Sequence, residues 1–368
     1  MSALPLFMSL VNHLISDGFF AYIYILCLYC LFFRAKINHQ QFNRGAVMKN
    51  YNHALLVMEK HDYPAEAREV IIRTEEKIIA DEKANKIYEA MYRAYWLKNR
   101  NFGEFSDKSE ALAELIGESK YTVNFVLLLN CTKPLLTKYR KEKIDEEIYW
   151  RSVLDLKSKM IECKENYDIW GTFVEGWFKG FYEMNRFALG RFQFENSDFW
   201  CDMYIKNGVE LYDSDFVVGM HIPSNQGPIT YDVRMDAYRK AHAFFKDKFK
   251  DPRYGIFCCN SWLLYPDNLN ILPEKSNIAD FLLDFEPLEI KWTYDFGDQW
   301  RVFGVKNNRT PVEELPQNTS MQRAYVDWFK KGKKSGHAYG IIVYDSETDT
   351  LLTRRDRASF IKEYCYEK

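Results

Sequence analysis

The sequence predicts an α+β architecture, in which a helical first half precedes a mixed α/β sheet flanked by helices. Apolar residues at helical spacing on charged sequence dominate residues 48–164, whereas apolar and polar residues alternate strictly from Arg191 onward. A strand–loop–helix–strand–helix order then follows between residues 216 and 285. The length of 368 residues is ample for two domains, and eight of the nine tryptophans lie from Trp150 onward. The two halves therefore differ in kind.

Residues 1–47 differ from the rest of the chain. Phe19 to Phe33 is an uninterrupted apolar run, shorter than the roughly 20 residues that a spanning helix needs, and only an extension back to Leu14 reaches that length. Basic residues follow the run, so an anchor within residues 14–33 would leave the main body in the cytoplasm. No positive segment precedes the run, which argues against a secretory signal. We prefer a translation start at Met48 to a single membrane anchor, and we expect a cytoplasmic protein.

Charged sequence with helically spaced apolar residues continues from residue 48 to residue 165. Four runs carry this spacing: residues 65–79, 87–97, 108–116 and 121–139. The last contains a continuous apolar stretch, which predicts a buried helix. We therefore expect a helical domain over residues 48–165, which forms one wall of a cleft, and a second domain over residues 166–368.

Charge and cysteine content exclude several classes of protein. The net charge is −2 and no basic block is present, so nothing indicates a nucleic-acid partner. Cys27 and Cys30 have a metal-like spacing, but they lie in an apolar run without polar support. Cys258 and Cys259 are adjacent, so on a strand they would point to opposite faces. We expect buried, reduced thiols and no metal site.

The run from Arg186 to Glu195 is the most informative stretch of the chain. From Arg191 onward, polar Arg191, Gln193 and Glu195 alternate with phenylalanines, which is the period of a strand with one buried face. A cation, an amide and a carboxylate thus recur at every second position, next to an aromatic-rich helix. Polar groups aligned in this way beside a core indicate a working site.

Further strands and helices follow in alternation. Thr230 is the expected N-cap of the first of these helices, because its hydroxyl can accept from free amides of the first turn. The predicted elements are a strand over Phe216–Ile222, a loop over Pro223–Thr230, a helix over Tyr231–Phe249, a strand over Gly255–Leu264, a helix over Ser276–Phe285, a strand over Leu288–Phe296, a helix over Thr319–Lys331 and a strand over His337–Tyr344.

Four separated pieces occur in the order GWFKGFYEMNRFALGRFQFE, HIPSNQGPIT, FCCNSWLLYP and LPEKSNIADF. Together they resemble the C-terminal domain of a bacterial two-domain N-acyltransferase family with a GNAT-like fold. The resemblance covers residues 167–296, and the helical region before it resembles the family's N-terminal domain. It implies an enzyme that moves an acyl group, acetyl or longer, from acyl-CoA to a small-molecule amine or peptide by direct attack.

The resemblance also implies where the coenzyme would bind. Two neighbouring parallel strands separate in such folds, so that the pantetheine arm inserts between them, and here the pair would be 216–222 and 255–264. The pyrophosphate would rest on the loop 223–230 and on the helix N-terminus behind it. The candidate cofactor-binding residues are Ile222, Ser224, Asn225, Gln226, Gly227, Thr230 and Asn260.

The loop departs from the usual pyrophosphate pattern. It has a single glycine, Gly227, followed by Pro228, which has no N–H to donate. Asp232 falls in the first helical turn, where it would repel a phosphate. Two alternatives therefore stay open: a donor other than acyl-CoA, or a catalytically inactive ligand-binding module with the same fold.

Glu195 and His221 are the two candidates for the general base. A hydrophobic wall beside Glu195 would raise its pKa into a useful range, although a salt bridge to Arg191 or Arg186 is an equally good interpretation. His221 lies at a strand end directly before the loop, where it could transfer protons or simply bind a backbone carbonyl. One of the two could also orient the other.

The remaining roles fall on polar residues near the same strand ends. Asn260 and Ser261 could donate to an oxyanion. Ser261 lacks the surroundings of a covalent nucleophile, since no G-x-S-x-G motif encloses it. In the resembled fold a tyrosine often protonates the leaving thiolate, and Tyr265 is the nearest. Candidate substrate contacts are Arg191, Gln193 and Trp177, the last of which could equally be a packing residue.

A carbohydrate-active hydrolase is a third class to consider, because tryptophan and acidic residues are abundant. It would need two carboxylates that flank one groove. The acidic residues to check are Glu175, Glu183 and Glu195, and their separation in the fold would dismiss this class.

Overall fold

The computed structural model describes residues 48–96, 102–293 and 295–366. The chain divides into two units between Asn52 and His53, and the described residues from His53 onward form one compact unit, which contains the sheet and the candidate site. Residues 14–33, where a membrane anchor was the alternative to a start at Met48, lie outside the described residues. Among the helices that are described, none combines the length and the apolar character that crossing a bilayer requires.

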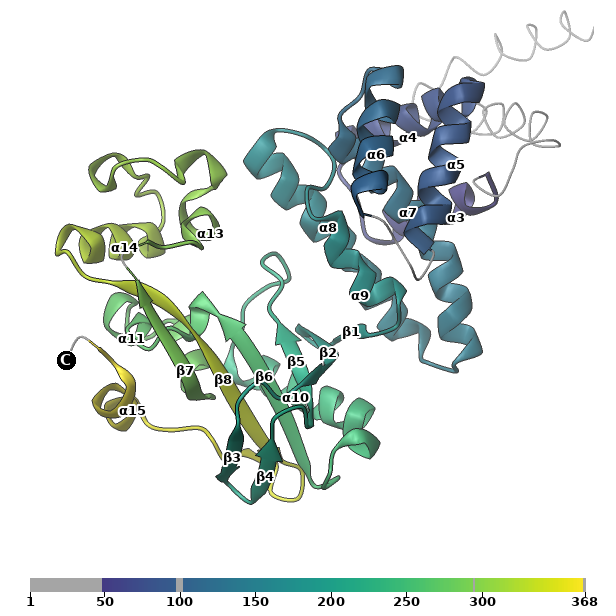
Figure 1. The fold of residues 1–368 in the computed structure, drawn as a ribbon. Helices are drawn as coiled ribbons and strands as arrows, with labels where there is room; N and C mark the ends of the chain where they lie inside the picture. The colour runs from purple at the N-terminus through teal and green to yellow at the C-terminus, as the bar shows by residue number, and fades with distance from the viewer. Residues whose placement is uncertain (1–47, 97–101, 294, 367–368) are drawn as a thin grey trace, which may run out of the picture. The chain divides into compact units, whose positions relative to one another are not determined.

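Helices alone form the first part of the described chain (Figure 1). They are α3 (Met48–Lys60), α4 (Ala65–Ala80), α5 (Glu82–Trp96), α6 (Phe102–Ile116), α7 (Lys120–Lys141) and α8 (Glu146–Tyr167). Ser119 caps α7 by accepting from the amide of Tyr121, and Asp145 caps α8 by accepting from Glu147. The centre of α7 is buried, as its apolar run predicts. The helical character of this region is confirmed.

A mixed sheet follows the helices. Its strands are β1 (Arg186–Leu189), β2 (Phe192–Asp198), β5 (Phe216–His221), β6 (Tyr254–Ser261), β7 (Glu286–Thr293), β8 (Ser335–Asp345) and β9 (Thr350–Leu351). The order is β1-β2-β5-β6-β8-β7, with β9 on β8, and the pair β5–β6 is parallel while its neighbours pair antiparallel. The predicted mixed sheet flanked by helices is confirmed.

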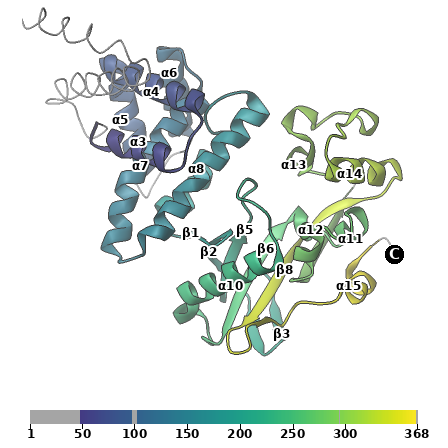
Figure 2. The same ribbon diagram turned by 180° about the vertical axis from the view of Figure 1, so that it is seen from behind.

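Helix α10 (Tyr231–Phe245) packs against this sheet through an aromatic core (Figure 2). Tyr238 on the helix lies 5.9 Å from Phe192 and 5.7 Å from Phe257, measured between ring centroids. Phe194 lies 5.5 Å from Phe257. The phenylalanines of the alternating run therefore supply the buried face that the sequence predicts. The helix ends at Phe245, earlier than predicted, and a short 3₁₀ turn follows.

Short elements complete the fold. They are η2 (Glu175–Phe178), α9 (Lys179–Tyr182), η3 (Lys246–Lys248), η4 (Trp262–Leu264), α11 (Asn268–Ile271), α12 (Asn277–Leu282), α13 (Gln299–Phe303), η5 (Val305–Asn307), η6 (Val312–Glu314), α14 (Ser320–Lys330) and α15 (Arg357–Tyr364). Ser276 caps α12 and Thr319 forms a capping box with Gln322. A separate antiparallel pair joins β3 (Met203–Lys206) to β4 (Val209–Tyr212).

The run from Arg186 to Glu195 forms a hairpin of β1 and β2, and the strand that the alternation predicts from Arg191 onward begins at Phe192. Leu189 pairs with Phe192, and the chain turns at Gly190 and Arg191. Gly190 has φ +68, and a Cβ there would lie 2.8 Å from the Cα of Ala237. Glycine alone fits this turn without strain, so the strand cannot continue through it. Arg191 is thereby separated from the strand face that carries Gln193 and Glu195.

Two local predictions at later elements hold only in part. Strand β6 ends at Ser261, and the apolar residues that follow form a 3₁₀ turn capped by the Ser261 side chain. Thr230 stands at the N-cap position of α10, but its side chain makes no capping hydrogen bond. The amides of that first turn are therefore not covered by the hydroxyl that the sequence suggested.

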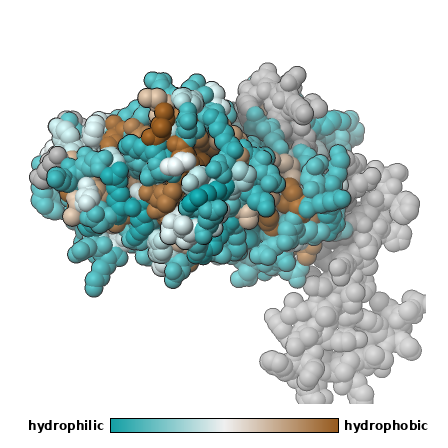
Figure 3. Space-filling model, turned by 90° about the horizontal axis from the view of Figure 1, so that it is seen from below, coloured by the Kyte–Doolittle hydropathy of each residue, from teal (hydrophilic) through white to brown (hydrophobic). Residues whose placement is uncertain are grey.

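Cysteines 258 and 259 are both buried, and burial raises the pKa of each thiol to about 12. They are free thiols, as are Cys163 and Cys201. The surface seen in Figure 3 is mostly hydrophilic, with small separate hydrophobic areas. Exposed large apolar side chains include Trp200, Met203 and Ile205.

Candidate active site

The parallel strands β5 and β6 separate towards their carboxyl ends. They are in register at only two positions, where Val218 faces Phe257 and Gly219 faces Cys258. Beyond this point β5 continues to His221 and β6 to Ser261, without further pairing to each other. Backbone groups at the diverging ends are therefore available to a ligand that lies between the strands.

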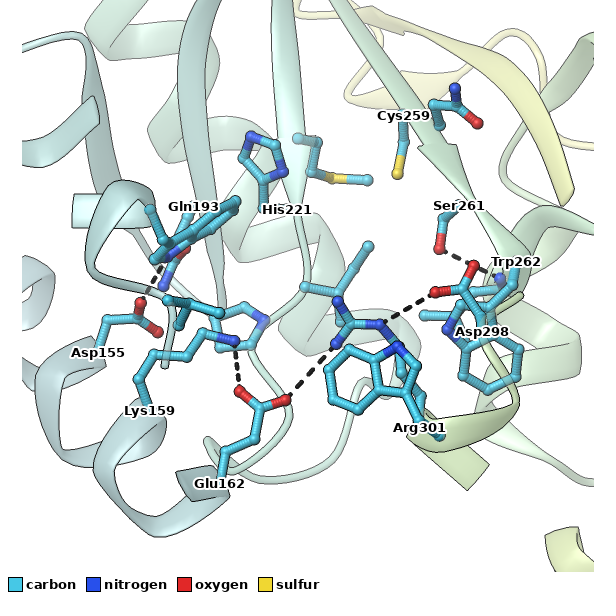
Figure 4. Close-up of a pocket in the computed structure, with 18 residues that line it drawn as sticks. Asp155, Lys159, Glu162, Gln193, His221, Cys259, Ser261, Trp262, Asp298 and Arg301 are labelled. Carbon is cyan, nitrogen blue, oxygen red and sulfur yellow. Dashed lines mark hydrogen bonds and ion pairs between the residues drawn. The ribbon is translucent and has the colours of Figure 1, made fainter. Parts of the chain in front are cut away.

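A cavity of about 330 Å³ opens at these strand ends (Figure 4). Met220 and His221 line it from β5, and Cys259 and Asn260 line it from β6. Successive residues of a strand point to opposite faces, so the cavity reaches both faces of the sheet between the two strands. Its other walls come from Asp155, Lys159 and Glu162 of α8, from Val174, Trp177 and Gln193, from Ile222, Pro223, Ser261, Trp262 and Leu263, and from Asp298, Trp300 and Arg301.

His221 and Glu195 form a hydrogen-bonded pair at the edge of this cavity. The Nε2 atom of His221 lies 2.8 Å from Oε1 of Glu195. The other carboxylate oxygen of Glu195 accepts from Nε and Nη2 of Arg186, at 2.9 and 2.6 Å. His221 lines the cavity, and Glu195 stands behind it. Of the two interpretations of Glu195, the salt bridge to Arg186 is formed, and the same carboxylate also contacts the other candidate, His221.

The pKa of Glu195 lies below its ordinary value. Burial pushes the pKa up, but the hydrogen bond and charge of His221 and the charge of Arg186 push it down by more. The expectation that a hydrophobic wall raises this pKa is therefore wrong, because two cationic or hydrogen-donating partners outweigh desolvation. Glu195 stays ionised and is suited to orient His221 rather than to accept a proton itself.

Trp177 is held on three sides next to the histidine. Its Nε1 donates to Oδ2 of Asp155 at 2.8 Å, and the Cζ atom of Arg186 lies 3.6 Å from the ring centroid. Its ring meets that of His221 edge-on, with centroids 4.9 Å apart. These contacts fix one orientation of the indole in the cavity wall. The two alternatives for Trp177 therefore coincide, because a packed ring also lines the cavity.

Helix α8 contributes three polar side chains that the sequence interpretation missed. Asp155, Lys159 and Glu162 recur at i, i+4 and i+7, so they share one face of the helix. Lys159 Nζ lies 2.7 Å from Glu162, which also lies 3.7 Å from Arg301 of α13, and Figure 4 shows Glu162 between the two cations. The polar residues stand in the sequence at helical spacing, but nothing local to the helix shows that this face meets the ends of β5 and β6.

Asp155 is the most deeply buried of these acids, with 1% of its surface exposed. Burial raises its pKa, while Lys159, Gln193 and Trp177 act in the opposite direction. Its Oδ1 atom and the Nε2 atom of Gln193 are both buried without a geometrically satisfactory hydrogen bond in the described part of the chain. Gln193 faces His221 across β2 and β5 and lines the cavity.

The loop between β5 and α10 meets the cavity only at its start. Ile222 and Pro223 line the cavity among the described loop residues, whereas Ser224, Asn225, Gln226, Gly227 and Thr230 lie farther along the loop. Arg191 makes two hydrogen bonds to the backbone of the loop. Its Nε donates to the carbonyl of Gly227 at 3.0 Å, and its Nη2 donates to the carbonyl of Pro223 at 2.8 Å. Arg191 itself is not part of the described cavity lining.

The end of β6 brings Asn260 and Ser261 to the cavity, but Tyr265 lies elsewhere. Ser261 Oγ accepts from the amide of Leu263 at 3.1 Å. Tyr265 is fully buried and its hydroxyl donates to the carbonyl of Lys334 at 3.2 Å. Because the 3₁₀ turn after Ser261 redirects the chain, Tyr265 is absent from the described lining of the cavity.

Glu175, Glu183 and Glu195 do not flank one groove. None of the three is among the described residues that line the cavity, and Glu195 is bound by Arg186 and His221. The pair of converging carboxylates that a glycoside hydrolase needs is therefore not formed by these residues. The hydrolase interpretation is dismissed on the criterion set by the sequence.

A mixed sheet whose central parallel strands diverge over a cavity, with a loop and helix N-terminus behind them, defines the GNAT-like class of fold. Residues 187–342 match the model of the GNAT-like C-terminal domain, and residues 53–184 match that of the N-acyltransferase N-terminal domain. The chain belongs to the two-domain N-acyltransferase family. The predicted family and the predicted acyltransferase class are confirmed.

Solved structures of acyltransferases share the fold. An acyltransferase in complex with decanoyl-CoA is 22% identical, with a TM-score of 0.54 over 76% of this chain and 88% of its own. An acyltransferase in complex with decanoyl-CoA and teicoplanin is 18% identical, with a TM-score of 0.58 over 82% and 89%. At this identity the similarity establishes the fold alone. No curated protein matches the chain in sequence.

Proposed function

We propose that this protein is an acyl-CoA-dependent N-acyltransferase that acylates an amine by direct attack. The observation that carries the proposal is the parallel pair β5–β6, which loses its pairing after Gly219 and Cys258 and opens over a cavity. A pantetheine arm has amide groups that can satisfy the unpaired backbone of both strands, as an added strand would. Acyl-CoA complexes of similar folds support this choice of donor.

The donor site would extend from the strand ends to the loop. The thioester would lie between His221 and Asn260, and the pyrophosphate would lie at the loop 223–230 and the N-terminus of α10, where amides and the helix dipole favour an anion. The apolar lining from Met220, Trp262 and Leu263 suits an acyl chain. Medium-chain thioesters should be compared with acetyl-CoA, because similar folds hold decanoyl-CoA and octanoyl-CoA.

Proton transfer falls to His221 with Glu195 behind it. With Nε2–H donated to the ionised Glu195, the lone pair of Nδ1 is the acceptor for a proton. As the amine nitrogen forms its bond to the thioester carbonyl, one N–H proton passes to Nδ1. When the carbon–sulfur bond breaks, the same proton can neutralise the leaving thiolate. Glu195 stabilises the histidine in its charged state.

The developing oxyanion would be met by donors at the end of β6. Ser261 accepts from the Leu263 amide through its oxygen, so its O–H hydrogen remains for a ligand. Asn260 is an exposed residue that lines the cavity next to it, and unpaired amides of the strand stand beside both. Donors fixed before reaction stabilise charge without reorganisation.

The acceptor would enter on the side formed by the helical domain. Asp155, Lys159 and Glu162 of α8, together with Asp298 and Arg301, make a polar wall. Such a wall suits an amine carried on a polar molecule rather than a hydrocarbon. The teicoplanin complex of a similar fold is consistent with an acceptor of this kind. We propose a small-molecule or peptide-like amine as the acceptor class.

The test is a calorimetric titration of the full chain with acetyl-CoA, octanoyl-CoA and free CoA. We expect saturable micromolar binding of at least one thioester. His221→Ala should bind the same thioester within about threefold, and transfer to a reactive amine should fall by about 10²- to 10⁴-fold. Binding without any transfer to a broad amine panel would favour a ligand-binding module, and no binding by folded protein would refute the donor.

A further inference from the structure

Arg191 is a buried cation that has no carboxylate partner among the residues that the structure describes. It is 7% exposed, and its Nη1 atom has no hydrogen-bond partner among the described residues. Other buried arginines of the same sheet domain are paired, Arg186 with Glu195 and Arg234 with Asp284. Burial lowers the pKa of Arg191. An unpaired buried charge is unfavourable, and an anionic ligand close to it would supply the missing counter-charge.

The position of this charge is set by two carbonyl groups of the loop. Nε and Nη2 donate to Gly227 and Pro223, which stand at the two ends of a five-residue stretch. Both carbonyl oxygens therefore turn inward to Arg191, away from any ligand on the outer side. A loop that receives an anion must turn its carbonyls away in this manner, because their partial negative charge would repel it.

The N-terminus of the helix behind the loop lacks a hydrogen bond from its N-cap side chain. Helix α10 is 15 residues long, and the side chain of its N-cap, Thr230, makes no capping hydrogen bond. The first-turn amides and the positive end of the dipole are thus not neutralised by that hydroxyl. Gly227 has φ +88, and a Cβ built there would meet nothing within 4 Å. A ligand can therefore approach this backbone closely.

We propose that Arg191 is the positioning residue and counter-ion of the pyrophosphate site, and that it replaces from the β1–β2 turn the cation that the loop sequence lacks. The proposal rests on the proposed acyl-CoA donor. The ligand chemistry is a pyrophosphate diester, which carries two negative charges. Asp232 lies in the first turn of α10, where its carboxylate opposes an anion, so the site needs a cation from elsewhere. Arg191 donates to carbonyl groups of the loop and is not among the described residues that line the cavity.

The proposal is tested by comparing two thioesters, of which only one carries the pyrophosphate together with the 3′-phosphoadenosine of coenzyme A. One is octanoyl-CoA, and the other is octanoyl-pantetheine, which has no phosphate group. Calorimetry should show that Arg191→Met weakens octanoyl-CoA binding by about 10- to 100-fold and changes octanoyl-pantetheine binding by less than about threefold. Arg191→Lys keeps the charge. The logarithm of the ratio of the two dissociation constants should therefore stay at half or more of its wild-type value.

Arg151 provides a matched control, because its Nη2 donates to the carbonyl of Gly190 in the same turn at 2.6 Å. Arg151→Met should leave both dissociation constants within about twofold. Equal loss for both thioesters in Arg191→Met, or loss for neither, would overturn the proposal. If Arg191→Met does not fold, loss of the phosphate preference in folded Arg191→Lys overturns it. A wild-type chain that binds neither thioester instead refutes the donor itself.

Discussion

His221 and Glu195 meet diagonally across β2 and β5, with Nε2 and Oε1 2.8 Å apart. In the register of these strands Glu195 faces Gly219, and His221 faces Gln193. The diagonal contact is open because Gly219 has no side chain: a Cβ there would lie 3.2 Å from Cγ of Glu195. The glycine of the sequence FVVGMH therefore gives the carboxylate room to reach the histidine two residues later.

Glu195→Gln tests this relationship. Glutamine keeps the shape of the side chain but removes the charge that stabilises protonated His221, so kcat should fall by about 10- to 100-fold with little change in KM. Steady-state kinetics with the best thioester and amine measure it. Asp198→Asn, an exposed position on the same strand, should leave kcat within about twofold. An unchanged kcat in Glu195→Gln would show that Glu195 has a structural role and does not assist His221.

Trp177→Phe separates the indole hydrogen bond from the ring contacts. The phenyl ring can still pack beside His221, but the buried Oδ2 of Asp155 loses its donor. The free energy of unfolding should fall by about 1–3 kcal/mol, measured by urea denaturation. Trp292→Phe changes a ring that is 40% exposed and should cost less than about 0.5 kcal/mol. Equal costs for the two variants would contradict the role of the Asp155 contact.

Gly190→Ala tests the turn that places Arg191. The substitution combines a positive φ of +68 with a Cβ 2.8 Å from backbone of Ala237, so it should destabilise the fold by about 2–4 kcal/mol. Gly117→Ala has a similar φ of +64 with nothing within 4 Å of the added Cβ, and should cost about 1 kcal/mol. Thermal unfolding of both variants measures the difference. Equal melting temperatures for the two variants would show that the close approach of α10 adds nothing to the cost of Gly190→Ala.

Glu75→Gln should change how stability depends on pH. Glu75 is buried in α4, where desolvation raises its pKa to about 8 despite a hydrogen bond from Asn130 at 3.1 Å. The folded state therefore holds its proton more tightly than the unfolded state, whose pKa is about 4.3. Stability linked to Glu75 is fully present below that pH and is lost as pH rises towards 8.

Glutamine cannot ionise, so Glu75→Gln should remove this loss. We expect it to be more stable than wild type by a few kcal/mol, on the order of the pKa difference, at pH 8.5 and nearly equal to it at pH 4.5. Chemical denaturation at several pH values gives the curve. Glu76→Gln, the exposed neighbour, should run parallel to wild type. A constant difference between Glu75→Gln and wild type at all pH values would contradict burial of an ionisable carboxyl.

Much of the fold could be predicted from local patterns. The phenylalanines of β2 alternate because one face of that strand meets α10, and the spacing alone predicts this. The hairpin at Gly190 could not be predicted from the alternation, which begins only after it, and the close approach of Ala237, 47 residues later, is visible only in the fold. The capping serines and threonines at α12 and α14 were predictable, whereas the open N-cap of α10 was not.

The residues of the candidate site also divide into those that local sequence patterns predict and those that only the fold reveals. His221, Asn260 and Ser261 were predictable because a strand end followed by a turn is a local signal, and Gln193 because a polar residue alternates with a buried face. Tyr265 was chosen by its nearness in sequence, and a 3₁₀ turn directs it into the core. Asp155, Lys159 and Glu162 were missed because nothing local shows which strand ends a helix surface will face.

The sequence by itself determined the class of fold, the family and the segments that could carry chemistry, because helix and strand periods, caps and motif order are local properties of the chain. Only the tertiary structure decided the partners of each polar side chain. In the fold, Glu195 is an ionised partner of Arg186 and His221, and Arg191 binds a carbonyl group of the loop instead of lying on the strand face. Charges and hydrogen bonds depend on distances between residues far apart in sequence, so their effects on pKa and function follow from packing rather than from periodicity.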